Sequence, residues 1–130
     1  MFAQIRGIDY QYITYQTIPP GGAQTEFRNE LRFLLYAWKP ESDRLADCLY
    51  KAAEQILKNQ VILTDYARDG DPDWEENFYI LRKTPCVAVL SENYFMDNKS
   101  DLEYLQNQTG KQAIIDTHVE GIEEWIESNI

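Results

Sequence analysis

Hydrophobic residues along this chain fall into short continuous runs and into helical repeats. Five segments rich in apolar, β-branched or aromatic residues predict strands, at residues 10–18, 32–38, 61–66, 86–90 and 112–119. Between residues 40 and 59, apolar side chains return every three or four positions, which predicts a helix with one buried face. Pro40 suits the first turn of that helix, where a missing N–H costs nothing.

Capping residues predict further helices. Asp71 followed by Pro72 is typical of a helix start, with the aspartate as N-cap. Ser100 and Glu103 have the spacing of a capping box, and Gly110 is placed to end the short helix that follows. The apolar face of a last helix consists of Ile122, Trp125 and Ile126.

The alternation of strands and helices over residues 1–130 predicts a single α/β domain with a mixed, partly parallel sheet. A chain of 130 residues is long enough to bury one hydrophobic core. It contains no run of about 18 apolar residues and no signal-peptide pattern. Its two cysteines, Cys48 and Cys86, are too few for a disulfide framework. Together these features predict a cytoplasmic protein without a membrane span.

Acidic residues outnumber basic residues by 22 to 12, which gives a net charge of −10. Residues 61–130 hold fifteen acidic and five basic residues, so the excess lies in the second half of the chain. Such a field repels nucleic acid and anionic membranes, and it attracts a basic protein partner. The alternative is that the acidic surface serves only solubility.

The closely spaced aspartates near residue 70 raise the question of a calcium loop. An EF-hand loop that began at Asp69 would need glycine at its sixth position and glutamate at its twelfth. Those positions hold Trp74 and Ile80, so the motif fails. The chain also has a single histidine, His118, and no close cysteine pair, so it lacks a zinc pattern. No metal site is therefore predicted, and His118 is expected at the surface.

Two stretches of the chain resemble the thioredoxin superfamily. Residues 61–90, VILTDYARDGDPDWEENFYILRKTPCVAVL, are similar to the strand, acidic loop and short helix that precede the characteristic proline of that family. Residues 32–42, RFLLYAWKPES, are similar to the strand that ends in Trp-Cys-x-x-Cys. The resemblance implies a thioredoxin-like mixed sheet of about four to five strands, with helices on both faces and an extra short helix before the last strand. It also implies a cis peptide bond before Pro85.

The resemblance places Lys39 and Ser42 where the two cysteines of the motif would follow Trp38. Disulfide exchange needs a thiolate and a second thiol, so the chain is expected to be redox-inactive. The first hypothesis is an adaptor or regulatory module that binds another protein and needs no cofactor. One alternative is a single-thiol oxidoreductase or glutathione-dependent enzyme centred on Cys86, with Pro85, Lys39 and Ser42 around it. A second alternative is a small acidic inhibitor or immunity-type protein.

A contact surface is predicted in the segment inserted before the last strand, because long insertions in compact folds are often functional. Its residues are aromatic, apolar or acidic: Tyr94, Phe95, Met96, Asp97, Asp101 and Glu103. The tyrosines of the first strand, Tyr10, Tyr12 and Tyr15, are further candidates. The alternative for both groups is ordinary packing in the core and on the sheet.

Overall fold

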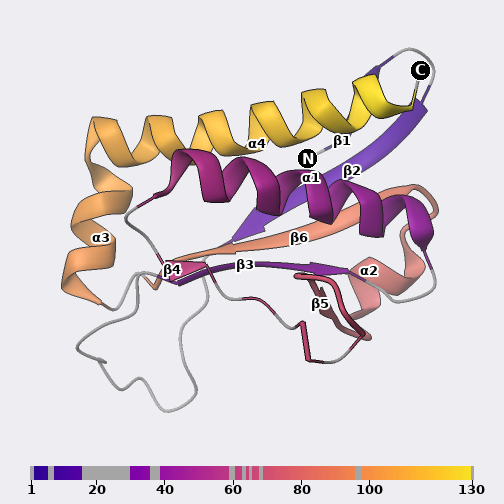
Figure 1. The fold of residues 1–130 in the computed structure, drawn as a ribbon, viewed down its shortest axis with the longest axis horizontal. Helices are drawn as coiled ribbons and strands as arrows, with labels where there is room; N and C mark the ends of the chain where they lie inside the picture. The colour runs from indigo at the N-terminus through magenta and orange to yellow at the C-terminus, as the bar shows by residue number, and fades with distance from the viewer. Residues whose placement is uncertain are drawn as a thin grey trace.

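The computed structural model shows a six-stranded sheet and four helices within the part of the chain that it describes (Figure 1). The described residues are 2–5, 8–15, 30–35, 39–58, 61–62, 64, 66–67, 69–95 and 98–129. The strands are β1 (Phe2–Ile5), β2 (Ile8–Tyr15), β3 (Glu30–Leu35), β4 (Val61–Ile62), β5 (Trp74–Glu75) and β6 (Val87–Asn93). The helices are α1 (Pro40–Ile56), α2 (Tyr79–Lys83), α3 (Lys99–Gln106) and α4 (Gln108–Ser128).

The sheet has the strand order β1-β2-β6-β3-β4, and β5 extends it by pairing with β3. β6 therefore lies in the middle of the sheet. It runs parallel to β2 and antiparallel to β3. β4 and β5 both run parallel to β3, while β1 and β2 form an antiparallel pair at the other edge.

The two long helices, α1 and α4, pack against each other and on one face of the sheet (Figure 1). Leu49 of α1, Trp125 of α4 and Val89 of β6 are almost completely buried in one shared cluster. Burying a large apolar side chain contributes about 1.5–3 kcal/mol. This three-element core therefore holds both helices on the sheet.

The opposite face of β6 carries a smaller apolar cluster. Ala88 and Leu90 alternate with Val89 along the strand, so their side chains point away from α1 and α4. They pack with Leu81 of α2 and with Trp74 of β5. α2 therefore covers part of the sheet face that the long helices leave open.

Residues 112–119, predicted as the last strand, lie inside α4 instead. Asn107 caps this helix, because its side chain accepts a hydrogen bond from the Gly110 N–H at 2.6 Å. Gly110 therefore lies in the first turns of a helix and does not end one. The buried residues of α4 recur at helical spacing: Gly110, Thr117, His118, Gly121 and Trp125.

Two other predicted helix starts are also wrong. The N-cap of α3 is Asn98, whose side chain accepts hydrogen bonds from the N–H groups of Ser100 and Asp101, both at 3.1 Å. Ser100 thus lies within the first turn. Asp71 and Pro72 precede β5, because the residues that follow pair with β3 and do not begin a helix.

The thioredoxin-like fold expected from the sequence is wrong at two specific points. All peptide bonds in the described residues are trans, so the bond before Pro85 is not cis. The last strand of the expected sheet is absent, since α4 takes up that part of the chain.

Candidate functional site

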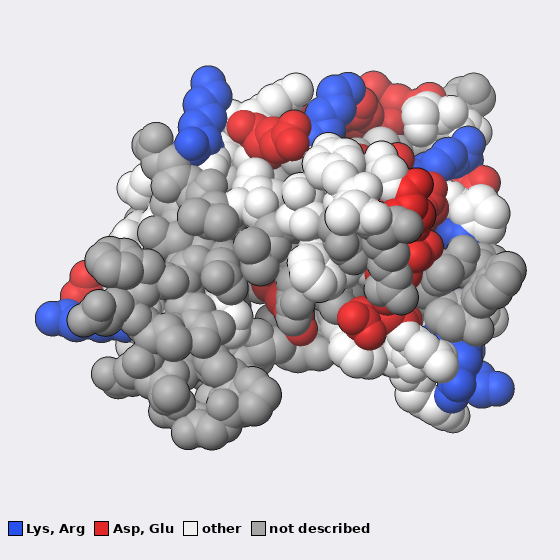
Figure 2. All heavy atoms as spheres, turned by 60° about the horizontal axis from the view of Figure 1, so that its bottom comes forward, with Lys and Arg blue, Asp and Glu red and all other residues white. Residues whose placement is uncertain are grey.

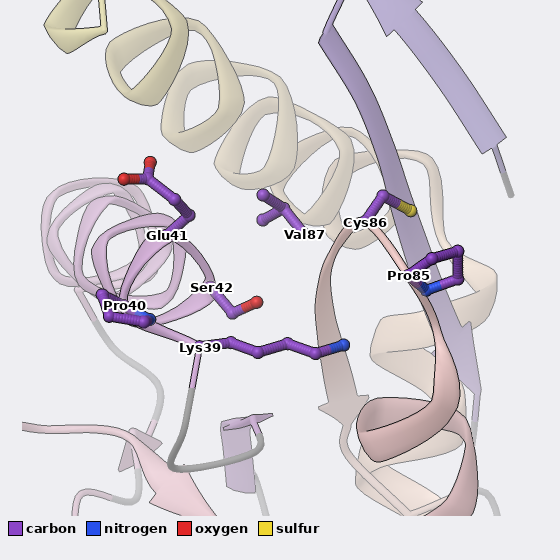
Figure 3. A pocket seen from close by; sticks show the side chains of 7 residues that line it. All are labelled: Lys39, Pro40, Glu41, Ser42, Pro85, Cys86 and Val87. Carbon is purple, nitrogen blue, oxygen red and sulfur yellow. The ribbon is translucent and has the colours of Figure 1, made fainter.

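A groove with a volume of about 240 Å³ lies between the start of α1 and the segment that leads into β6 (Figure 3). Its lining residues are Lys39, Pro40, Glu41, Ser42, Pro85, Cys86 and Val87. The structure thus brings together the four residues that the sequence predicts as the alternative, single-thiol site. Figure 3 shows the side chains of Lys39, which directly precedes α1, and of Ser42 in its first turn both extending toward the strand side of the groove.

Hydrogen bonds engage the polar ends of Lys39 and Ser42. Lys39 Nζ donates to the carbonyl oxygen of Leu81 at 2.7 Å and to that of Thr84. The buried Ser42 hydroxyl oxygen accepts a hydrogen bond from the N–H of Ala88 at 3.1 Å. Burial lowers the pKa of Lys39. Because these bonds join α1 to α2 and β6, we assign both side chains a structural role in holding the groove together.

Three polar residues stand at the carboxyl end of β6: Ser91, Glu92 and Asn93, all buried. Asn93 Nδ2 donates to Ser91 Oγ at 2.9 Å, on the face of the strand that α4 covers. Glu92 alternates with these two, so its side chain lies on the opposite face, in line with Leu90. Burying a carboxylate is costly unless the group is paired, so the buried Glu92 stands out among the residues of this strand.

His118 lies on α4, against the face of β6 that is opposite to Glu92. Its Nδ1 is 2.6 Å from the carbonyl oxygen of Ile114, and its Nε2 is 3.1 Å from Ser91 Oγ. A carbonyl oxygen only accepts, so Nδ1 carries the proton and Nε2 accepts from the Ser91 hydroxyl. Burial lowers the pKa of His118, which keeps the ring neutral at pH 7. The expectation of a surface histidine is wrong, and the His118–Ser91 pair is a buried structural contact.

The residues of the predicted contact surface are only partly placed together. Tyr94 and Asp101 are buried, and the Asp101 carboxylate accepts a hydrogen bond from the Phe95 N–H at 2.9 Å. Phe95 is half-buried and Glu103 is exposed. Met96, Asp97 and Trp38 lie outside the described residues. Because Tyr94 and Asp101 are buried, they cannot form the predicted contact surface. That role stays a prediction for the other four residues.

Tyr94 directly follows β6 and lies in the left-handed backbone region, with φ of 60°. This conformation is uncommon for a bulky residue and costs on the order of 1 kcal/mol. The buried ring packs edge-to-face on Tyr104, with a centroid separation of 5.3 Å, and this contact offsets part of the strain. The turn at Tyr94 sets where β6 stops, directly after Glu92 and Asn93.

A separate acidic cluster forms where the start of α1 meets the loop before β5. Asp43, Asp71 and Asp73 each place a carboxylate oxygen within 4.8 Å of the other two. Burial and the neighbouring Asp71 carboxylate raise the pKa of Asp73 to about 8. Sequence spacing indicates Asp71 and Asp73 but misses Asp43, because that residue belongs to a distant helix.

Glu92 is the other residue that sequence reasoning missed. Its only local signal is a carboxylate two positions after the apolar strand residues from Val87 to Leu90. An apolar run of this kind predicts a strand, but it does not indicate on which face of the sheet the carboxylate lies.

Known proteins similar to this chain are amidases. Residues 29–124 match the family model Amidase_3, the N-acetylmuramoyl-L-alanine amidases. Over 69 residues the chain is 41% identical to the N-acetylmuramoyl-L-alanine amidase CwlM of Bacillus licheniformis, a match that covers 53% of this chain and 25% of that protein.

Solved amidases have the same fold. The N-acetylmuramoyl-L-alanine amidase of Clostridium difficile 630 superposes with a TM-score of 0.69 and 16% identity, over 90% of this chain and 58% of that one. The CwlD amidase of Clostridioides difficile, solved in complex with the GerS lipoprotein, superposes with a TM-score of 0.67 and 15% identity, over 90% of this chain and 54% of that one. The chain therefore spans a little over half the length of these solved amidases and about a quarter of CwlM.

These similarities overturn the thioredoxin-like resemblance and the functions built on it. A redox-inactive thioredoxin-like adaptor, a single-thiol or glutathione-dependent enzyme at Cys86 and an acidic immunity-type protein are all wrong as descriptions of this chain. Since the family model matches most of its length, the chain belongs to the N-acetylmuramoyl-L-alanine amidase family.

Proposed function

We propose that this chain acts in peptidoglycan hydrolysis as part of an amidase catalytic domain, with Glu92 as its proton-transfer group. The bond concerned is the amide between the N-acetylmuramoyl group and L-alanine, as the family name states. The observation that carries the proposal is the buried Glu92 carboxylate at the end of the central strand, on the face away from α1 and α4.

Amide hydrolysis needs a base that takes a proton from the attacking water and an acid that returns it to the leaving amine. A carboxylate can perform both steps in turn, and such a group typically contributes a factor of about 10²–10⁴ to the rate. Glu92 suits this role because the middle strand of a sheet holds its backbone rigidly in place. The buried surroundings also strengthen electrostatic interactions with a reacting group.

The chain supplies only part of the machinery that this reaction needs. Metal-assisted hydrolysis usually draws on several imidazole ligands, which leave one coordination position open for water. This chain has one histidine, and both of its ring nitrogens contact groups of α4 and β6. We therefore place the group that activates water in the part of the amidase domain that this chain does not span.

A chimera tests the proposal directly. Residues 29–124 would replace the matching segment of the Clostridium difficile 630 amidase, and release of L-alanine amino termini from peptidoglycan would be measured. Glu92→Gln should lower kcat by about 10²-fold or more while the protein remains folded. Glu103→Gln removes the same charge from an exposed site on α3 and should leave the rate unchanged.

Two results would count against the role of Glu92. One is an active chimera in which Glu92→Gln and Glu103→Gln have equal rates. The other is a folded chimera, shown by circular dichroism and a cooperative thermal transition, that releases no amino termini at all.

A protein partner is a second proposal, supported by the CwlD amidase, which was solved with the GerS lipoprotein. The exposed Glu103 and the half-buried Phe95 on and before α3 are the predicted contact residues that remain available. A partner co-purified with the wild-type chain should bind at least tenfold more weakly to Glu103→Lys, measured by surface plasmon resonance. Equal affinities for the two proteins would remove α3 from the proposed contact surface.

A further inference from the structure

Three carboxylates from two distant parts of the chain meet at one point. Asp43 lies in the first turn of α1, and Asp71 and Asp73 lie in the loop before β5. One oxygen from each lies within 4.8 Å of the other two. Three like charges at this distance repel one another strongly when all are ionised.

Burial makes the arrangement more costly. Asp73 is only 1% exposed, and neither of its carboxylate oxygens has a hydrogen-bond donor among the described residues. Asp71 Oδ1 is likewise buried without such a donor in the described part of the chain. Buried polar atoms are nearly always satisfied in native proteins, so a buried carboxylate without a donor requires a bound ion or a shared proton.

Basic side chains near the start of α1 are engaged elsewhere. Lys39 donates to the carbonyl oxygens of Leu81 and Thr84. Arg44 pairs with Glu41 and also donates to Asn129. Neither of these cations therefore neutralises the three aspartates.

We propose that Asp43, Asp71 and Asp73 bind one calcium ion, which joins the start of α1 to the loop before β5. Carboxylate oxygens are the ligands that hard divalent cations prefer. Two oxygens on opposite sides of one calcium ion are up to about 5 Å apart, because each lies about 2.3–2.6 Å from the metal. Oxygens that all lie within 4.8 Å of one another can therefore share one calcium ion, whereas magnesium usually keeps several waters and takes only one or two carboxylates.

The midpoint of thermal unfolding tests calcium binding at this site. The full chain is first stripped of metal by a chelator. Calcium at about a hundredfold excess over its dissociation constant should raise the midpoint by roughly 10 °C. Magnesium at the same concentration should raise it much less. Asp73→Asn should abolish the response to calcium without lowering the metal-free midpoint, because it removes one of the repelling charges.

Glu54→Gln is the control. Glu54 is exposed, lies on α1 and is not one of the three ligands. If calcium only screened the acidic surface, Glu54→Gln and Asp73→Asn would weaken the response equally, and the proposed site would be overturned. Equal shifts from magnesium and calcium would overturn the preference for the larger ion.

Terbium provides a direct readout that does not depend on stability. This ion replaces calcium at oxygen-rich sites and emits light when a nearby tryptophan is excited, and Trp74 directly follows Asp73. We expect sensitised emission that calcium displaces and that Asp73→Asn loses. A folded wild-type chain with neither terbium emission nor a calcium shift would overturn the proposal, and the cluster would then hold a shared proton.

Discussion

Single buried polar side chains hold together parts of this molecule that are distant in the sequence. The Ser42 hydroxyl accepts from the N–H of Ala88, and Lys39 reaches the carbonyl oxygens of Leu81 and Thr84. Each neutral bond of this kind contributes about 0.5–1.5 kcal/mol, and a charged donor contributes more. These bonds span the groove whose residues were predicted as a single-thiol site. The structure does bring those residues together, but the polar groups of Lys39 and Ser42 stabilise the fold.

At the same scale, His118 should make stability depend on pH. Its folded pKa is lowered by burial, so between that value and about 6.5 the unfolded chain binds more protons than the folded chain. Stability is therefore present above about pH 6.5 and is lost as pH falls through this window toward the folded pKa.

Urea unfolding of the wild type and of His118→Gln at several values between pH 7.5 and 5 measures this effect. The wild type should lose more stability over the range than the variant, which has no imidazole to protonate. Carboxylates contribute to acid sensitivity in both proteins, so the difference isolates His118. Identical slopes would show that the ring does not titrate differently in the folded and unfolded states.

At the scale of elements, the contact between α1 and α4 depends on a glycine. A Cβ atom added at Gly121 would lie 2.8 Å from Leu49 Cδ2 and 2.9 Å from Leu49 Cα. The second distance involves backbone, so rotation of a side chain cannot relieve it. The two helices approach closely because this position has no side chain, and the core around Leu49 and Trp125 depends on that approach.

Gly121→Ala should therefore destabilise the protein by about 1–3 kcal/mol. Alanine favours a helix over glycine by about 1 kcal/mol, so the clash must outweigh a gain in intrinsic helix stability. Glu120→Ala, on the exposed side of the same helix, serves as the control and should change stability little. A stabilised Gly121→Ala, measured by denaturant unfolding, would show that the helices separate at low cost.

At the scale of the whole molecule, acidic side chains occupy the middle and right of the face shown in Figure 2, with most basic side chains toward its margin. Among the described residues, no helix is long and apolar enough to cross a bilayer. A cytoplasmic location stays a prediction, which cell fractionation tests. A single domain over residues 1–130 also stays a prediction, which limited proteolysis tests. The chain covers 54% and 58% of the two clostridial amidases described above, so the proposed activity depends on complementation by the remaining part of such a domain.

The sequence by itself determined the elements whose signals are local. The apolar stripe behind Pro40 predicts α1, and the apolar runs at residues 32–38 and 86–90 overlap β3 and β6. Periodicity of this kind depends only on neighbouring residues, so it can be read without knowing the fold. Alternating strands and helices, however, occur in many α/β folds, and for that reason the thioredoxin-like interpretation was wrong.

Only the tertiary structure decided what depends on distant contacts. Residues 112–119 are helical because Asn107 caps α4 and Trp125 packs against α1, whereas an eight-residue window fits a strand equally well. Glu92 became a candidate because β6 lies in mid-sheet with its other face covered by α4. Asp43 joined Asp71 and Asp73 because packing brings the start of α1 to their loop. The spacing of residues along the sequence carries no information about these contacts, because long-range packing brings the residues together.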